Sequence, residues 1–156
     1  YKFMEVSIMS KAANEKMNVL LADLNVLYRK VQNYHWNIDG KNFFTIHAKL
    51  EEFYNWINVQ IDEIAERILS IKGRPYGTMK KYLEITNIKE AHDEEIVDLD
   101  IVKALKADFE TILAELKDIK KIVDEEDDYG TSAMMDELII GYETKLWMLG
   151  AFLKKN

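Results

Sequence analysis

The chain has 156 residues, a formal net charge of −7, one proline and no cysteine. This length suits a single domain with a substantial core, and we expect one domain over residues 1–156 that begins with a flexible arm at 1–9. The lack of cysteine excludes disulfides and thiolate metal sites, so any metal ligands must be nitrogen or oxygen atoms. The acidic balance argues against a basic groove for nucleic acid. Neither a spanning apolar run nor a signal-peptide pattern occurs, and we therefore expect a cytoplasmic protein with no membrane partner.

Apolar residues recur at helical spacing along most of the chain. The first predicted helix covers about 10–37. The second begins near Asn42, a favourable N-cap residue, and ends at the glycine- and proline-rich stretch 73–77. Tyr54 and Trp56 place aromatic rings on more than one face of this second helix. Because a bundle helix needs only one apolar face, we interpret them as marking a subunit interface.

The connection over about 72–98 is long for a helical bundle, and it contains a predicted short helix at 79–85. Two more helices follow at about 99–123 and 131–153, separated by an acidic loop at 124–130. The long connection favours a crossover between parallel neighbours rather than a hairpin. The sequence therefore predicts an all-α four-helix bundle with one long crossover.

Candidate metal ligands gather around the second helix. His47 and Glu51 are four residues apart, as are Asp62 and Glu66, so each pair shares a helix face with about 5–6 Å between partners. His47 and Asp62, however, are separated by about 22 Å along one helix, which is too far for both to bind one ion. Two copies of this helix, packed antiparallel about an axis near Trp56, would bring the opposite ends together. This geometry predicts a metal site shared between two subunits.

Each part of this pattern also has a simpler interpretation. Either histidine alone is explained by packing or by a place on the surface, and Asp62 and Glu66 are explained as a solvated helix face beside Arg67. His92, in the acidic stretch 90–95, is interpreted as a loop residue. The Glu-x-x-His motif that holds iron inside larger bundles is absent. The residues three positions before the histidines are Gln32, Phe44 and Lys89.

The stretch 34–81 resembles the Dps family, the miniferritins, and the similarity extends over nearly the whole chain, including 145–153. The specific feature is the spacing: a second histidine follows the first by twelve residues, and carboxylates follow it by four, fifteen and nineteen. This is the family's ferroxidase spacing. The resemblance implies a ferritin-like four-helix bundle with a short extra helix in the long crossover. It also implies a hollow homododecamer with iron sites at its two-fold interfaces.

Carried over by position, the resemblance implies a defined set of iron ligands. His35, His47 and Glu51 would come from one subunit, and Asp62 and Glu66 from its two-fold mate. Many members have aspartate where this chain has Glu51. The longer side chain changes the reach of the carboxylate and leaves its direct coordination open.

The implied activity is oxidation of Fe(II), preferably by hydrogen peroxide, with storage of the ferric mineral and protection against oxidative stress. Trp36 matches the family tryptophan beside the iron site, where it would pack and quench oxidising equivalents. Zinc suits the same ligands and is expected as a competitor. The acidic residues of 124–128, with Asp136 and Glu137, are candidates for a three-fold pore that attracts cations. They are equally explained as a solvated loop.

Two other functions are weighed against this one. A DNA-compacting structural protein with a minor iron role would need clustered cations, and the two ends of the chain offer few. We therefore predict weak or absent DNA binding. A helical interaction module with no metal role would leave the histidine and carboxylate spacing unexplained. The lysines nearest the two ends are Lys2, Lys11, Lys16, Lys154 and Lys155.

Overall fold

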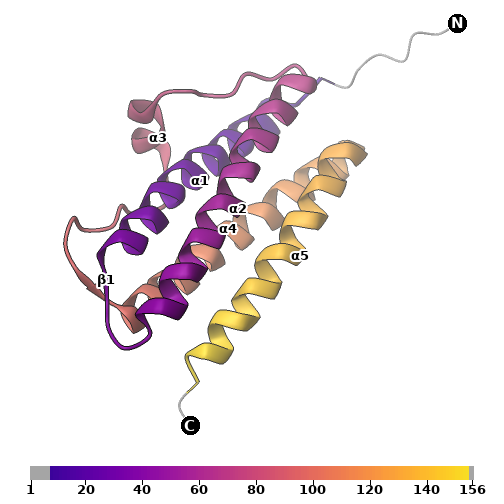
Figure 1. The fold of residues 1–156 in the computed structure, drawn as a ribbon. Coiled ribbons are helices and arrows are strands. Elements are labelled where there is room, and N and C mark those ends of the chain that lie inside the picture. Colours follow the sequence, from indigo (N-terminus) through magenta and orange to yellow (C-terminus); the bar gives the residue numbers. More distant parts are fainter. Residues whose placement is uncertain (1–7, 155–156) are drawn as a thin grey trace, which may run out of the picture.

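Five helices make up most of residues 8–154, the part of the chain that the computed structural model describes (Figure 1). Four are long: α1 (Lys11–Asn37), α2 (Phe43–Ser70), α4 (Asp98–Glu125) and α5 (Tyr129–Phe152). The fifth is the short α3 (Met79–Ile85), which lies in the connection between α2 and α4. The all-α fold and the extra helix in the crossover are thereby confirmed. The predicted arm lies mostly outside the described residues.

A small parallel β pair, which the sequence analysis did not predict, ties the crossover to the turn after α1. Strand β1 (Ile38–Asp39) pairs with β2 (Ile96–Val97), with Ile38 opposite Ile96. At the other end of the bundle, the Met9 N–H donates to the Ile71 carbonyl at 3.0 Å. Backbone hydrogen bonds therefore hold both the segment that follows α1 and the segment that follows α2.

The long helices form two antiparallel pairs, α1 with α2 and α4 with α5. Helices α2 and α4 run in the same direction, as predicted (Figure 1). They are not close neighbours, however, because the helices whose backbones approach α4 closely are α5 and α1. The parallel helices lie diagonally and meet only through core side chains, such as the rings of Phe53 and Phe109 at 5.5 Å.

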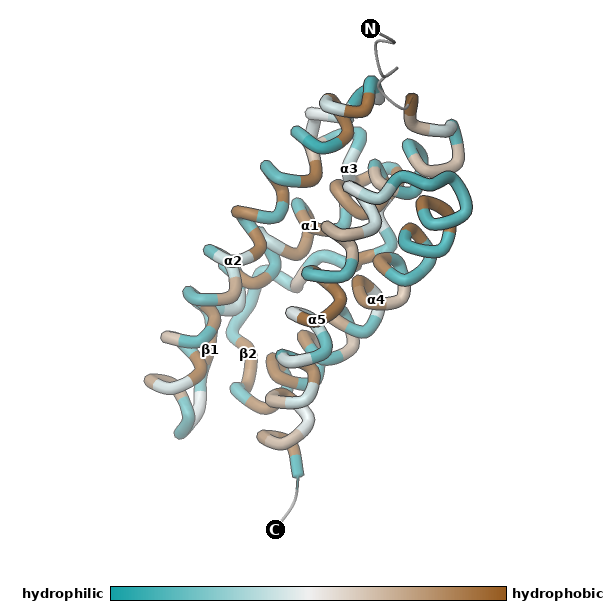
Figure 2. The backbone as a smooth tube through the Cα atoms, turned by 90° about the vertical axis from the view of Figure 1, so that its right-hand side faces the viewer, coloured by the Kyte–Doolittle hydropathy of each residue, from teal (hydrophilic) through white to brown (hydrophobic). Residues whose placement is uncertain are grey.

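Apolar residues on the facing sides of the helices form one continuous core. In Figure 2 each long helix carries both hydrophobic and hydrophilic positions, as expected for helices with one buried side. Side chains such as Leu24, Ile64 and Phe109 are completely buried. Each such aliphatic or aromatic side chain contributes about 1.5–3 kcal/mol through its removal from water.

Trp56, which the sequence analysis interpreted as marking a subunit interface, is half-buried and packs largely on its own bundle. Its ring packs inside its own bundle, 4.6 Å from the ring of Tyr142 and 6.2 Å from that of Phe109, and the Lys145 ammonium lies over it at 3.7 Å. Tyr54 also packs within the chain, edge-on to Tyr28 at 6.0 Å. The bundle core is wide enough at this level to accept rings from two sides of α2.

The acidic loop is shorter than predicted. Helix α4 continues to Glu125 and α5 already begins at Tyr129, so only three residues connect them. Asp127 adopts a left-handed backbone (φ 56°), and the Asp128 N–H returns to the Val123 carbonyl at 2.9 Å. This is the closing bond of a Schellman-type helix end. The next helix then starts at once because the Asp128 side chain accepts the Thr131 N–H at 3.1 Å.

Candidate metal centre

His35 and His47 meet at one end of the bundle, where α1 passes into α2. His35 is in the last turn of α1 and His47 in the second turn of α2. Their rings stack with centroids 3.7 Å apart and planes 11° apart. The prediction that the two histidines lie close together at one end of the bundle is confirmed.

The turn that aligns these helices is held by Asp98 at the start of α4. Its carboxylate accepts the Asn42 N–H at 2.9 Å and the Leu99 N–H at 2.7 Å, and these bonds lower the pKa of Asp98. Asn42 occupies the predicted N-cap position, but its side chain makes no capping bond. Gly40 has a φ of 131°, and a Cβ there would lie 2.6 Å from the Asp98 carboxylate. Only glycine allows this close approach.

Each histidine fixes the other through a backbone carbonyl. His35 Nδ1 lies 2.7 Å from the His47 carbonyl oxygen, and His47 Nδ1 lies 2.8 Å from the His35 carbonyl oxygen. A carbonyl only accepts hydrogen bonds, so both Nδ1 atoms must carry the proton. Both Nε2 atoms are then left with a free lone pair. This is the arrangement in which outer hydrogen bonds prepare imidazoles to bind a metal ion.

Glu51 lies one turn further along α2, beside these rings. The Tyr54 hydroxyl donates to Glu51 Oε1 at 3.3 Å, and the Tyr54 ring stands edge-on to His35 at 5.4 Å. The pKa of Tyr54 is raised, first by partial burial and then by the neighbouring Glu51 carboxylate. Phe43 stacks on the other side of His47 at 4.9 Å. Aromatic rings thus surround the imidazoles while the Glu51 carboxylate remains exposed.

Asp62 and Glu66 are exposed one turn apart on the same face of α2, about 22 Å and about 28 Å from His47 by helical rise. Neither forms an ion pair with any residue between 8 and 154. Arg67, the nearby cation, turns away to bind Asp128 at 3.0 Å. The two carboxylates are therefore not neutralised by this neighbour.

Ligands for a complete site do not meet within one described chain. Residues 8–154 contain no group of three or more histidine, aspartate or glutamate side chains close enough to hold a metal ion. The histidine end and the carboxylate end of α2 each supply part of a ligand set. Trp36 projects outward beside the histidine end, 61% exposed, with the Arg29 guanidinium 5.7 Å from its ring.

The candidate pore residues are not a uniform acidic surface. Asp124 accepts from Ser132 and pairs with Lys120 at 3.3 Å, and Asp136 pairs with the same lysine at 3.1 Å. These contacts lower the pKa of Asp124 and raise that of Lys120. Asp128 is buried against Arg67. Three of the predicted residues are therefore engaged within the chain. The members that make no ion pair among residues 8–154 are Glu125, Glu126, Asp127 and Glu137.

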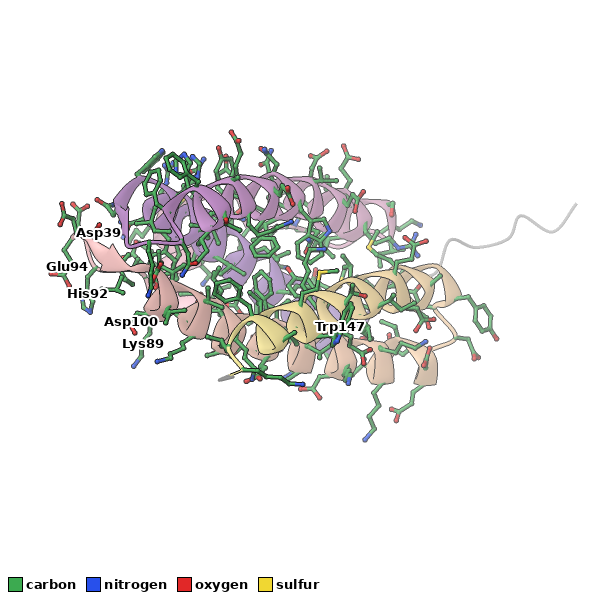
Figure 3. The ribbon with its side chains drawn as sticks, turned by 60° about the horizontal axis from the view of Figure 1, so that its bottom comes forward. Asp39, Lys89, His92, Glu94, Asp100 and Trp147 are labelled. Carbon is green, nitrogen blue, oxygen red and sulfur yellow. The ribbon has the colours of Figure 1, made fainter. Side chains whose placement is uncertain are left out.

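His92 is exposed in the crossover between α3 and β2, as predicted for a loop residue. Figure 3 places it with Asp39, Lys89, Glu94 and Asp100 at the end of the molecule formed by the small β pair, far from Trp147 on α5. The mixed charges of this end give no concentrated ligand set.

The sequence analysis did not identify the supporting role of Tyr54. Its position three residues after Glu51, one helical turn away, was the available signal. It also missed two carboxyl groups inside the protein, the fully buried Asp23 and the half-buried Glu115, which the helical pattern alone does not distinguish from surface residues.

Comparison with known proteins agrees with this fold. Residues 14–156 match the ferritin-like domain family. The "DNA protection during starvation protein 2" of Bacillus anthracis is 44% identical over 94% of this chain and 100% of its own length. A Dps crystal structure from Vibrio cholerae, described as a member of a superfamily of ferritin-like diiron-carboxylate proteins, has a TM-score of 0.89 and 40% identity, covering 92% of this chain and 90% of that one.

A zinc-soaked Dps from Listeria innocua is also similar, with a TM-score of 0.86 and 33% identity over 90% of this chain and 95% of that one. The fold and these matches define a ferritin-like protein. Within that class, the chain belongs to the Dps family. Among residues 8–154, no helix is both long enough and apolar enough to cross a membrane.

Proposed function

We propose that this chain is a ferroxidase and iron-storage subunit whose metal site is completed by a second copy. The observation that carries the proposal is the reciprocal bonding of His35 and His47, which leaves both Nε2 atoms free to bind a metal ion. Imidazole and carboxylate together suit iron. The remaining carboxylates, Asp62 and Glu66, lie at the far end of the same helix and need a partner subunit to reach the imidazoles.

A two-fold axis across α2 would satisfy this requirement. The midpoint between His47 and Glu66, and equally between Glu51 and Asp62, falls at residues 56–57. On the exposed side of the helix at this level lie Asn55, Asn58 and Val59. These side chains are the residues that we place against the partner, beside the half-buried Trp56. In this arrangement each dimer has two equivalent sites.

The ligand set favours the oxidation of Fe(II), the substrate. Carboxylates stabilise the higher charge of Fe(III) more than neutral ligands would. Hydrogen peroxide accepts two electrons, one from each of two Fe(II) ions; its O–O bond breaks, and two protons from solvent complete two water molecules. We propose peroxide as the preferred oxidant, because consuming it together with Fe(II) limits oxidative damage. Trp36, exposed beside the histidines, is placed to pack on the partner and to quench stray oxidising equivalents.

Storage would follow in a hollow homododecamer. Ferric product would move inward and mineralise on acidic groups of the cavity wall. Cations would be drawn in through an acidic pore, for which Glu125, Glu126, Asp127 and Glu137 are the residues without an ion pair in residues 8–154. Zinc would compete for the same nitrogen and oxygen ligands, and the zinc-soaked Listeria relative makes this a practical test ion.

DNA protection is the second candidate, because the relatives carry that description in their names. The net charge of −7 per subunit repels phosphate, and binding through counterion release needs clustered cations. We expect DNA binding to be weak or absent at physiological salt, so that any protection would come from removing iron and peroxide. Retention of DNA by the intact assembly at that salt would contradict this.

The decisive experiment is anaerobic loading of the protein with Fe(II), followed by hydrogen peroxide, with ferric absorbance and particle mass recorded together. We expect rapid oxidation in a twelve-subunit particle and its loss in Asp62→Ala. Glu63→Ala is the matched control, because Glu63 is the adjacent exposed carboxylate on α2 and is not one of the proposed ligands. Oxidation no faster than in buffer by the wild-type particle would refute the ferroxidase proposal.

A further inference from the structure

A buried polar cluster joins α1, the crossover and α4, separate from the candidate metal centre. Asp23 of α1 is completely buried. Its Oδ1 accepts the Thr86 hydroxyl at 2.6 Å and the Asn87 N–H at 2.6 Å. The Asn87 side-chain amide in turn donates to Glu115 Oε1 of α4 at 2.9 Å. Asp23 thus holds Thr86 and Asn87 of the crossover, and Glu115 from a second helix holds Asn87 as well.

The second oxygen of each carboxyl group has no partner. Asp23 Oδ2 and Glu115 Oε2 are both shielded from solvent and accept no hydrogen bond from the described residues. Two ionised carboxylates in this state would repel each other and would lack donors, at considerable cost. One proton between them would remove one charge and supply the missing donor. Burial, followed by the contact with Asp23, raises the pKa of Glu115 to about 8.

We propose that Asp23 and Glu115 share one proton, and that this proton stabilises the contact between the crossover and the bundle in a pH-dependent way. The only titratable neighbours on the open side are Glu15 and Lys16 of α1, which line the same cavity as Glu115 and Asn87 among the described residues. Lys16 lowers the pKa of Glu115 only slightly relative to burial, because its ammonium is exposed to water. It therefore does not replace the shared proton.

On the side that faces the bundle core, no unpaired cation from the described helices reaches Asp23 and Glu115. The Lys30 ammonium is held by Asp108 at 2.8 Å. Burial raises the pKa of Asp108, and the nearby Asp23 raises it further, so this side adds negative rather than positive charge. From α5, the buried Tyr142 hydroxyl donates to Gln60 at 2.8 Å. It is therefore not available as a donor to Glu115.

The sign of the pH dependence follows from this arrangement. Because the pKa of Glu115 is raised above its ordinary value, the closed cluster binds a proton that the opened chain releases. The stabilisation of the crossover is complete at acidic pH and is lost as the pH rises towards about 8. Above that pH both carboxylates are ionised and the crossover around residues 86–88 loosens.

The crossover part of this cluster is adjacent in sequence to α3, which contributes to a recess beside the candidate ligand Asp62. Residues 86–88 directly follow α3, and Tyr82 of α3 lines the same recess as Asp62. The shared proton therefore sets how firmly one wall of the Asp62 recess is held. This consequence needs no bound metal, and the proposal stands or falls independently of the ferroxidase activity.

The test is amide hydrogen exchange of the metal-free protein, corrected for the intrinsic effect of pH. Protection of the Asn87 backbone N–H against exchange should fall about tenfold for each pH unit from about 6 to 8 and then level off. In Glu115→Gln the side-chain amide donates to Asp23 at every pH, so protection should not change over this range. Glu110→Gln is the matched control, because Glu110 is exposed on the same helix and paired with Lys106, and it should behave like the wild type.

Infrared difference spectroscopy of the wild-type protein supplies a measurement that needs no variant. A protonated carboxyl group should be present at neutral pH, titrate near pH 8, and disappear in Glu115→Gln. Wild-type protection that is independent of pH, or the absence of a protonated carboxyl group at pH 7, would overturn the proposal.

Discussion

The rings of His35 and His47 are held in place by hydrogen bonds to backbone carbonyls that are not themselves candidate metal ligands. The spacing of His35 and His47 predicted that they would lie near each other. Their reciprocal bonds to backbone carbonyls could not be predicted, because these depend on how two helices cross and on the rotation of each ring. The same limit applies to Tyr54, whose hydroxyl reaches Glu51 only because α1 places His35 and Tyr28 against its ring.

The Tyr54 hydroxyl is expected to tune the affinity of the site for metal. Tyr54→Phe keeps the ring against His35 but removes the donor to Glu51, so the carboxylate loses its fixed orientation. Removal of such outer bonds reduces metal affinity by about tenfold or more. Titration of the assembled protein with Zn²⁺ would measure this change, and the loss should vanish when Glu51→Gln is already present.

Tyr28→Phe provides the control for that experiment. Its hydroxyl accepts from Gln32 at 3.1 Å and does not contact Glu51. An equal fall in affinity in both variants would show that general packing, rather than the bond to Glu51, is responsible.

At the scale of whole elements, hydrophobic periodicity predicted all four long helices and the short α3. It could not predict the β pair, because two-residue strands are too short to show a period. It also placed the end of α4 too early, since the acidic residues Asp124 and Glu125 continue the helix and are paired or solvated on its outer face. The packing of Trp56 on its own core could not be predicted, because periodicity gives the direction of a side chain but not how far the core extends.

The corner between α4 and α5 should depend strongly on Asp128. This side chain caps α5 through the Thr131 N–H and also binds the Arg67 guanidinium. Asp128→Ala removes a helix cap and leaves a half-buried cation without its partner, which should cost about 2 kcal/mol or more. Denaturant unfolding would measure this loss.

Glu126→Ala is the corresponding control, because Glu126 is exposed in the same connection and makes no ion pair among the described residues. Its effect should stay within about 0.5 kcal/mol. If both variants were equally destabilised, the connection itself rather than the cap and ion pair would be limiting.

At the scale of the whole molecule, the distance between the two ends of α2 is the main constraint on function. The sequence predicted this separation from spacing alone, because the rise of a helix is fixed. Which faces of two chains meet could not be predicted, since that depends on the surface that remains exposed after the bundle has formed.

A shared site predicts that two inactive variants will restore activity to each other. In a dimer of a His47→Ala chain and an Asp62→Ala chain, one site loses both halves while the other keeps His47 from one chain and Asp62 from its partner. Co-assembly should therefore recover up to about half of the ferroxidase activity in such mixed dimers. Mixed particles, separated by two affinity tags, would be assayed with Fe(II) and peroxide.

The control is co-assembly of His47→Ala with His47→Glu, which damages the same half in both chains and should recover nothing. Activity in that mixture would show that oxidation does not require His47, and none in the complementary mixture would contradict a site shared between chains.

The β pair and Asp98 also have a consequence for synthesis of the chain. The turn before α2 is held by Ile96, Val97 and Asp98, which are made more than fifty residues after His35. A nascent chain that has been synthesised only as far as α2 already contains the two imidazoles but lacks the hydrogen bonds that brace the turn. The corner that holds the two histidines is therefore fully braced only after β2 and Asp98 have left the ribosome, so the candidate ligands are fixed in position late in synthesis.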